Sequence, residues 1–200
     1  MTSSDVFEGI ASVAQLGTAI VLGLGVWVAY RQLYAWREQD IQKKRADIAE
    51  ELLAASLEVS DILRALRTPF DSIPEGERDN RNYVYEKRLD RFNEAAERFQ
   101  TLRRLQIRAN AVLGNGLVDE ATNVLFEVRQ KTIVAIQMLH DRRDVYGDED
   151  DATRQMYEEC RRDMWGIYSE KYDPLGMKQL GAIEILEKHL PPFVRYDKVD

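Results

Sequence analysis

The chain has 200 residues, and its 35 acidic residues outnumber its 28 lysines and arginines, which gives a net charge of −7. This acidic balance argues against general nucleic-acid binding, which needs a basic surface to displace counterions. The lone cysteine, Cys160, excludes an internal disulfide and fits a reducing compartment.

The first predicted element is a membrane span at residues 10–34, after a short external segment at residues 1–9. No charged side chain occurs in residues 10–30, and ~20 such residues let a helix cross the hydrocarbon core of a bilayer. A cleaved signal peptide is one alternative, but acids precede the run and bulky aromatics follow it, unlike the flanks of a signal peptide. A buried core helix is a second alternative, which the scarcity of polar side chains disfavours.

The basic residues beside this run predict its orientation. No lysine or arginine precedes it, whereas Arg31, Arg37 and the cluster at 43–45 follow it closely. Positive charge near a span marks its cytoplasmic side. We therefore expect the N-terminus outside and the rest of the chain in the cytoplasm.

Small and polar residues within the span form a candidate surface for self-association. Small side chains let transmembrane helices approach closely, and a glutamine can donate a hydrogen bond across the contact. Such residues are also common in spans that stay alone. The candidate residues are Gln15, Thr18, Ala19, Gly23 and Gly25.

Residues 35–190 are predicted to form an all-α, antiparallel bundle of four to five helices, followed by a tail at 191–200. Residues 26–68 contain no glycine or proline, so the spanning helix is expected to continue into the bundle until Pro69 ends it. Apolar residues repeat there at spacings of three and four, as in a coiled-coil seam. The seam is Ile41, Ile48, Leu52, Ala55, Val59, Ile62 and Leu66.

Four further helices are expected, at about 83–112, 117–141, 152–171 and 175–189. Each carries apolar residues at helical spacing, and those of the fourth are Met156, Cys160, Met164, Ile167 and Tyr168. Loop-forming residues separate the helices, at 69–82, at Gly114-Asn115-Gly116 and at the acidic stretch 144–151. No segment alternates as a strand does.

No catalytic, cofactor or metal motif is recognisable. Neither His140 nor His189 follows a glutamate three residues earlier, as the di-metal sites of helical bundles require. The acidic stretch lacks the glycine and glutamate positions of a calcium loop, and is better interpreted as a cap of the next helix. Nucleophile elbows and phosphate-binding glycine loops are also missing, and a catalytic pocket would be sought first around His140.

Two surfaces are candidates for contact with other molecules. The loop at 69–82 can bind a partner, because loops on rigid bundles often do, or can be a plain connector. Its candidate contact residues are Pro69, Phe70, Pro74 and Gly76. A basic stretch, Arg98, Arg103, Arg104 and Arg108, either meets anionic lipid or an acidic partner, or forms an ordinary solvated helix face.

Several stretches of sequence resemble a group of bacterial single-span proteins of unknown function. The stretches are Arg45-Ala-Asp-Ile-Ala-Glu-Glu-Leu-Leu, Ile62-Leu-Arg-Ala-Leu-Arg-Thr-Pro-Phe, Pro74-Glu-Gly-Glu and Tyr83-Val-Tyr-Glu-Lys-Arg-Leu. The resemblance covers roughly residues 10–145. It implies a bacterial inner-membrane protein with a cytoplasmic helical domain, and it implies no activity.

These observations together predict a membrane-anchored, non-enzymatic interaction or scaffold module without a cofactor. Its expected partners are the lipid bilayer and either further copies of the chain or another protein, but not nucleic acid. The alternatives are a membrane effector or sensor, as in phage defence or stress response, and a helical-bundle enzyme.

Overall fold

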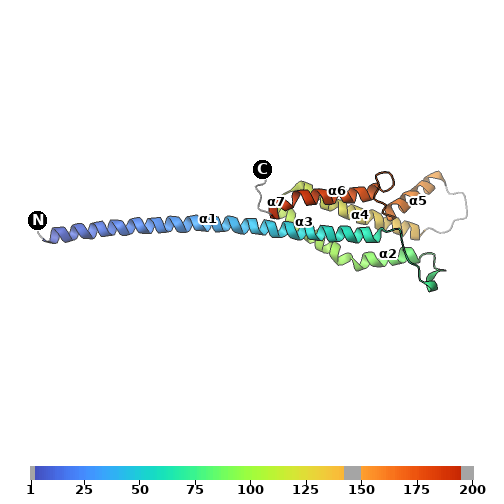
Figure 1. Ribbon diagram of the computed structural model, residues 1–200, viewed down its shortest axis with the longest axis horizontal. Helices are drawn as coiled ribbons and strands as arrows, with labels where there is room; N and C mark the ends of the chain where they lie inside the picture. Colours follow the sequence, from blue (N-terminus) through green and yellow to red (C-terminus); the bar gives the residue numbers. More distant parts are fainter. Residues whose placement is uncertain (1–2, 142–149, 195–200) are drawn as a thin grey trace. The chain divides into compact units, whose positions relative to one another are not determined.

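The computed structural model describes the backbone of residues 3–141 and 150–194, and the side chains of these residues except 3–16 and 18–20. The described residues form helices and no strand, so the predicted all-α class is confirmed (Figure 1). The elements are α1 (Ser3–Leu66), the 3-10 turn η1 (Glu75–Glu77), α2 (Tyr83–Glu94), α3 (Ala96–Leu113), α4 (Gly116–His140), α5 (Asp151–Met164), α6 (Pro174–His189) and α7 (Pro191–Val194).

The chain divides into two units, Met1–Lys44 and Arg45–Asp200. The first unit is helical from Ser3, and its described aromatic side chains are exposed, with the rings of Tyr30 and Tyr34 4.5 Å apart. Where the structure describes the chain, no helix is both long enough and apolar enough to cross a bilayer.

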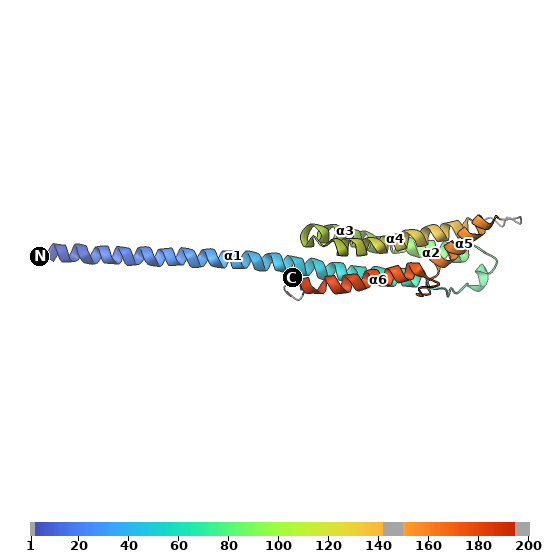
Figure 2. The same cartoon turned by 90° about the horizontal axis from the view of Figure 1, so that it is seen from above.

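The second unit is an antiparallel helical bundle. Ion pairs join Glu51 to Arg108 and Glu58 to Arg98, so position increases along α1 as it decreases along α3. Helix α4 packs on α6 and on α5. Figure 2 shows two layers in this unit, the bundle part of α1 with α6 and α3 with α4.

The core follows the predicted seam of α1, with one difference at positions 62 and 63. Ile48, Leu52 and Val59 are buried, whereas Leu63 is fully buried in place of the half-buried Ile62. Leu66, the next seam position, is buried as predicted, so the difference is confined to one turn of the helix. Ile41, in the first unit, is exposed within this chain.

The predicted helix at 83–112 is two helices. Helix α2 ends at Glu94, and Ala95 joins it to α3 in a tight turn, in which the Arg98 N–H donates to the Ala95 carbonyl. No glycine or proline marks this break in the sequence. The break that Gly114 predicts is confirmed, because Gly114 adopts a left-handed conformation after α3 and Asn115 caps α4.

The prediction that the helix at 152–171 extends through Ile167 and Tyr168 was wrong. Helix α5 ends at Met164, and Ile167 is 59% exposed. The Gly166 N–H donates to the Arg67 carbonyl at 2.7 Å, and Tyr168 has a φ of 51°, which an α-helix excludes. Long-range hydrogen bonds have replaced helical ones in this segment, which we call the 165–173 loop.

Candidate functional site

A buried ion pair lies where the bundle part of α1 ends. Arg67 Nη2 donates to Asp173 Oδ1 at 2.5 Å, and neither side chain is exposed. Arg67 Nε donates to the Asp163 carbonyl at 3.1 Å. One arginine thus joins the end of α1 to the end of α5 and to the start of α6.

Asp173 also organises the 165–173 loop, by accepting hydrogen bonds from backbone N–H groups. Its Oδ2 accepts the N–H groups of Ile167 and Tyr168, both at 2.9 Å, and its Oδ1 accepts the Gly176 N–H at 2.8 Å as the cap of α6. Burial tends to raise the pKa of this carboxyl, but Arg67 and the amide donors outweigh it and hold the pKa below its usual value.

A second buried arginine, Arg88 of α2, caps the other side of the same helix end. Its Nη1 donates to the Leu66 carbonyl and its Nη2 to the Thr68 carbonyl, both at 2.6 Å. The last carbonyls of a helix have no partner within the helix, so these bonds satisfy groups that would otherwise need water. Arg88 Nε also donates to Asp71 Oδ2 at 3.0 Å, which fixes the start of the 69–82 loop.

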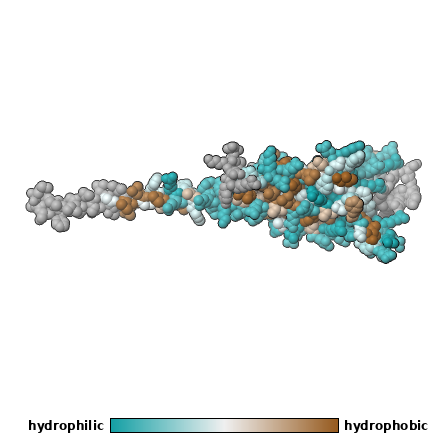
Figure 3. All heavy atoms as spheres, in the orientation of Figure 1, coloured by the Kyte–Doolittle hydropathy of each residue, from teal (hydrophilic) through white to brown (hydrophobic). Residues whose placement is uncertain are grey.

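The two anchored loops present apolar side chains to solvent. Phe70 is 88% exposed and Ile73 lies near it in sequence, while the 165–173 loop exposes Trp165 and Tyr172 in addition to Ile167. Figure 3 shows hydrophilic residues over most of the visible bundle surface, with smaller apolar patches between them. We call Phe70, Ile73, Trp165, Ile167 and Tyr172 the apolar loop set.

The four candidate contact residues of the 69–82 loop all lie on the surface. Pro69, Phe70, Pro74 and Gly76 are all exposed. The 165–173 loop was not predicted as a contact surface, because its apolar residues continue the helical spacing of α5. The positive φ of Tyr168 and the pairing of Gly166 with Arg67 carry no sequence signal of their own.

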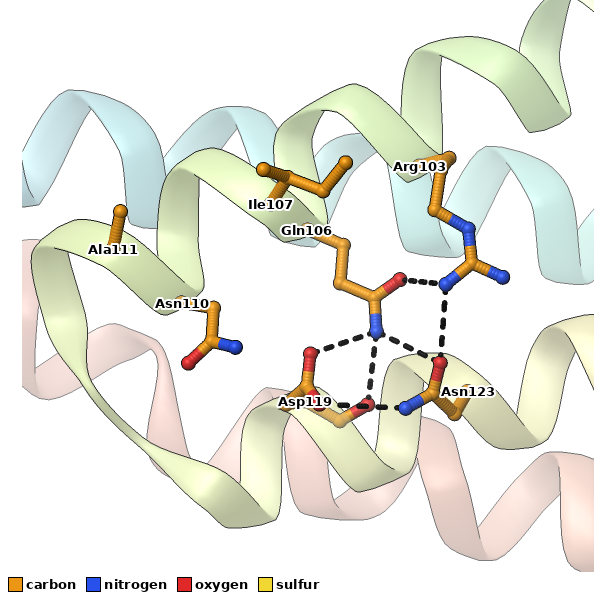
Figure 4. Close-up of a pocket in the computed structure, with 7 residues that line it drawn as sticks. All are labelled: Arg103, Gln106, Ile107, Asn110, Ala111, Asp119 and Asn123. Carbon is orange, nitrogen blue, oxygen red and sulfur yellow. Dashed lines mark hydrogen bonds between the residues drawn. The ribbon is translucent and has the colours of Figure 1, made fainter.

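A polar cavity of about 480 Å³ lies between α3 and α4 (Figure 4). At its centre the buried Gln106 donates to Asp119 Oδ1 at 2.8 Å and to Asn123 Oδ1 at 3.0 Å, and accepts from Arg103 at 2.8 Å. Arg103 also stacks on Phe126, 3.8 Å from the ring centre. These groups satisfy one another, so the network fastens α3 to α4.

The predicted basic stretch is divided among three environments. Arg103 faces the polar cavity, and Arg98 and Arg108 pair with Glu58 and Glu51 of α1 at 3.3 and 3.1 Å. Arg104 donates to Thr101 beside it. Arg103 therefore lies on the α4 side of α3, whereas Arg98, Arg104 and Arg108 lie on the side next to α1.

The remaining candidates are placed as follows. His140 Nδ1 lies 2.7 Å from Asp141 Oδ1, and Asp150 caps α5 by accepting the Thr153 N–H. Cys160 is buried, which raises the pKa of its thiol. Among the side chains that the structure describes, no group of histidine, cysteine and carboxylate residues is arranged to hold a metal.

The self-association candidates fall in the first unit. The side chains of Gln15, Thr18 and Ala19 lie outside the described residues. A Cβ atom added to Gly23 or Gly25 would meet nothing within 4 Å, so no packing within the described part of the chain calls for a glycine at either position.

Comparisons with protein-family models, with curated proteins and with solved structures find no match to this chain.

Proposed function

We propose that this chain is a membrane-anchored, non-enzymatic interaction module. In this proposal residues 10–34 cross a bacterial inner membrane, residues 1–9 lie outside, and the bundle lies in the cytoplasm. The support is the uncharged run at 10–30, followed by Arg31, Arg37 and the cluster at 43–45. Trp27 and Tyr30 are exposed within this chain and suit the interface between lipid and water.

The observation that carries the interaction role is the exposure of Phe70 on a loop whose start is fixed. Exposed apolar side chains on mobile loops lose much conformational entropy on binding, whereas the bonds of Arg88 to Thr68 and Asp71 hold this loop beforehand. Aromatic anchors that enter a pocket of the partner commonly dominate binding energy. The proposed partner is therefore a protein with an apolar pocket that accepts Phe70.

The charged groups that the bundle buries support a binding role more than a catalytic one. Arg67 pairs with Asp173, Asp173 also accepts the Gly176 N–H, and Arg88 donates to the Leu66 carbonyl. Each bond holds a helix end or a loop in place. These groups thus supply rigidity to the surface that carries the apolar loop set.

Capture of proteins from native membranes with the full chain and two variants tests the interaction role. Phe70→Ser removes the proposed anchor, and Leu117→Ser removes an exposed apolar side chain at the start of α4, outside the two loops. We expect the captured partner to be lost with Phe70→Ser and kept with Leu117→Ser. Equal capture by all three proteins rejects the loop as the recognition site.

A separate experiment tests the anchor and its orientation. A reporter fused after Asp200 should show cytoplasmic activity, and the protein should stay with membranes washed in carbonate. Periplasmic activity would contradict the orientation, and release by carbonate would contradict the span.

A further inference from the structure

One face of the bundle carries two parallel rows of opposite charge. From residue 46 to residue 63, every charged residue of α1 is acidic. Helix α3 beside it carries four arginines and one glutamate. We define the acidic row as Asp47, Glu51, Glu58 and Asp61, and the basic row as Arg98, Arg104 and Arg108; all seven side chains are exposed.

A hollow of about 610 Å³ is lined by both rows, which the two ion pairs bridge. Ala54, Ala55 and Leu105 contribute apolar surface to it, and Thr101 and Arg104 complete its α3 side. Alanines leave space between α1 and α3 because their side chains are too short to fill it. The face therefore combines an apolar depression with charged walls.

We propose that this face binds a second copy of the same chain, related by a two-fold axis parallel to α1 and α3. Such a rotation places the acidic row of each copy against the basic row of the other. A two-fold axis across the helices would instead place acidic row on acidic row and basic row on basic row. Like charges repel at such a contact, so the charge pattern selects the parallel axis.

The ion pairs within one chain already fix the register of this dimer. Glu51 pairs with Arg108 and Glu58 with Arg98, so the members of each pair lie at the same height along the bundle. A rotation about an axis parallel to the helices changes no height. Glu51 of each copy therefore meets Arg108 of the second copy, and Glu58 meets Arg98, without any shift along the helices.

The ion pairs within one chain do not strongly oppose the ion pairs between two copies. Each of the four side chains remains about half exposed, between 48% and 60%. Exposed ion pairs contribute little to stability, and a carboxylate has room for a second arginine. In the dimer the charges would form a network that excludes water from the alanine hollow.

Two double variants of the full chain test the proposal by charge reversal. Glu51→Arg with Glu58→Arg reverses the two acids that the dimer pairs, and Arg98→Glu with Arg108→Glu reverses the two arginines that face them. Each variant alone should self-associate at least ~10-fold more weakly than wild type, measured by sedimentation in mild detergent at low salt. An equimolar mixture of the two should restore association as a heterodimer, because both contacts are then complementary.

Two control variants distinguish this face from the rest of the bundle surface and from a general loss of folding. Glu184→Arg with Glu187→Arg reverses two exposed acids on α6 and should leave association unchanged. Glu51→Gln with Glu58→Gln keeps side-chain shape, should remain folded, and should weaken association together with its salt dependence. The proposal is overturned if wild type is monomeric at every concentration, if the reversed variants associate as wild type does, if the α6 control loses association, or if the mixture prefers no heterodimer. The proposed dimer uses a different face from the apolar loop set, so its test is independent of the test of partner recognition.

Discussion

Arg67 and Asp173 lie 106 residues apart in the sequence and form an ion pair that is closed to solvent on both sides. Burial makes such a pair a strong constraint, because either group left alone would be a charge without a partner in a medium of low polarity. Both residues of the pair also hold the 165–173 loop, since Asp173 accepts the Ile167 N–H and the Arg67 carbonyl accepts the Gly166 N–H.

Replacement of Arg67 by methionine should lower the free energy of unfolding by about 3–5 kcal/mol, because it leaves Asp173 charged and buried. Urea unfolding followed by circular dichroism measures the change. Arg98→Met is the matched control, since the Arg98–Glu58 pair is exposed, and its cost should stay below about 1 kcal/mol. Equal costs for the two variants would contradict the structural role of the buried pair.

Acid should weaken the bundle through Asp173. The pKa of its carboxyl is lower in the folded chain than the value of about 3.9 for an unfolded one, because Arg67 and amide donors outweigh burial. Its contribution is therefore complete above the unfolded pKa and is lost as the pH falls through the folded pKa. Asp173→Asn should reduce this loss of stability in acid when the free energy of unfolding is measured between neutral pH and about pH 2.

Asp163 should behave in the opposite sense. Burial raises the pKa of its carboxyl, so the folded chain holds this proton more tightly than the unfolded chain does. The carboxyl then favours folding at low pH, and this contribution is lost as the pH rises through the folded pKa. Asp163→Asn should therefore increase stability at neutral pH, with a difference that shrinks in acid. A loss of stability at neutral pH would show that its charge has a favourable partner.

Two glycines of α6 should respond to alanine with opposite signs. A Cβ atom on Gly176 would lie 2.2 Å from Asp173 Oδ2, whereas one on Gly181 would meet nothing within 4 Å. We expect Gly176→Ala to cost about 1–3 kcal/mol through displacement of the cap. Gly181→Ala should gain about 0.5–1 kcal/mol from helix propensity. Thermal unfolding of the two variants side by side checks both signs.

Association through the proposed span has its own test. Gly25→Leu and Gln15→Leu should each weaken an oligomer in detergent if the small residues of the span form the contact. Ile20→Phe is the control, because at about 100° per residue position 20 falls at least about 140° from Gln15, Thr18 and Gly25 on a helical projection. If crosslinking yields the same oligomer for all three variants, these residues face lipid and form no contact between helices.

The sequence was sufficient for the elements whose signals are local. Gly114 and Asn115 indicate the α3–α4 break, because Gly114 adopts a left-handed conformation and Asn115 caps α4. The apolar seam of α1 likewise selects Leu52 and Val59 as core. These predictions depend only on backbone preference and on spacing along one helix.

The anchoring of the loops could not be predicted in the same way. Arginines are mostly exposed in proteins, so nothing in the sequence marks Arg67 and Arg88 as the buried ones among so many. Their burial depends on acceptors from distant segments, namely Asp173 for Arg67 and the end of α1 for Arg88. The exposure of Ile167 follows from the same contacts, which is why the helical spacing of α5 was misleading there.

The long separation of these contacts has a consequence for how the chain folds during synthesis. The bundle part of α1 leaves the ribosome early, yet its hydrogen bonds to other elements reach residues 96, 106 and 119 positions later, as in Arg67 to Asp163, Arg67 to Asp173 and Ser60 to Gln179. Contacts of such high order form late, because the intervening chain must first be made. Nascent chains that stop before α6 should therefore leave the apolar side of α1 open to chaperones, and protease resistance should appear only when Gln179 has emerged.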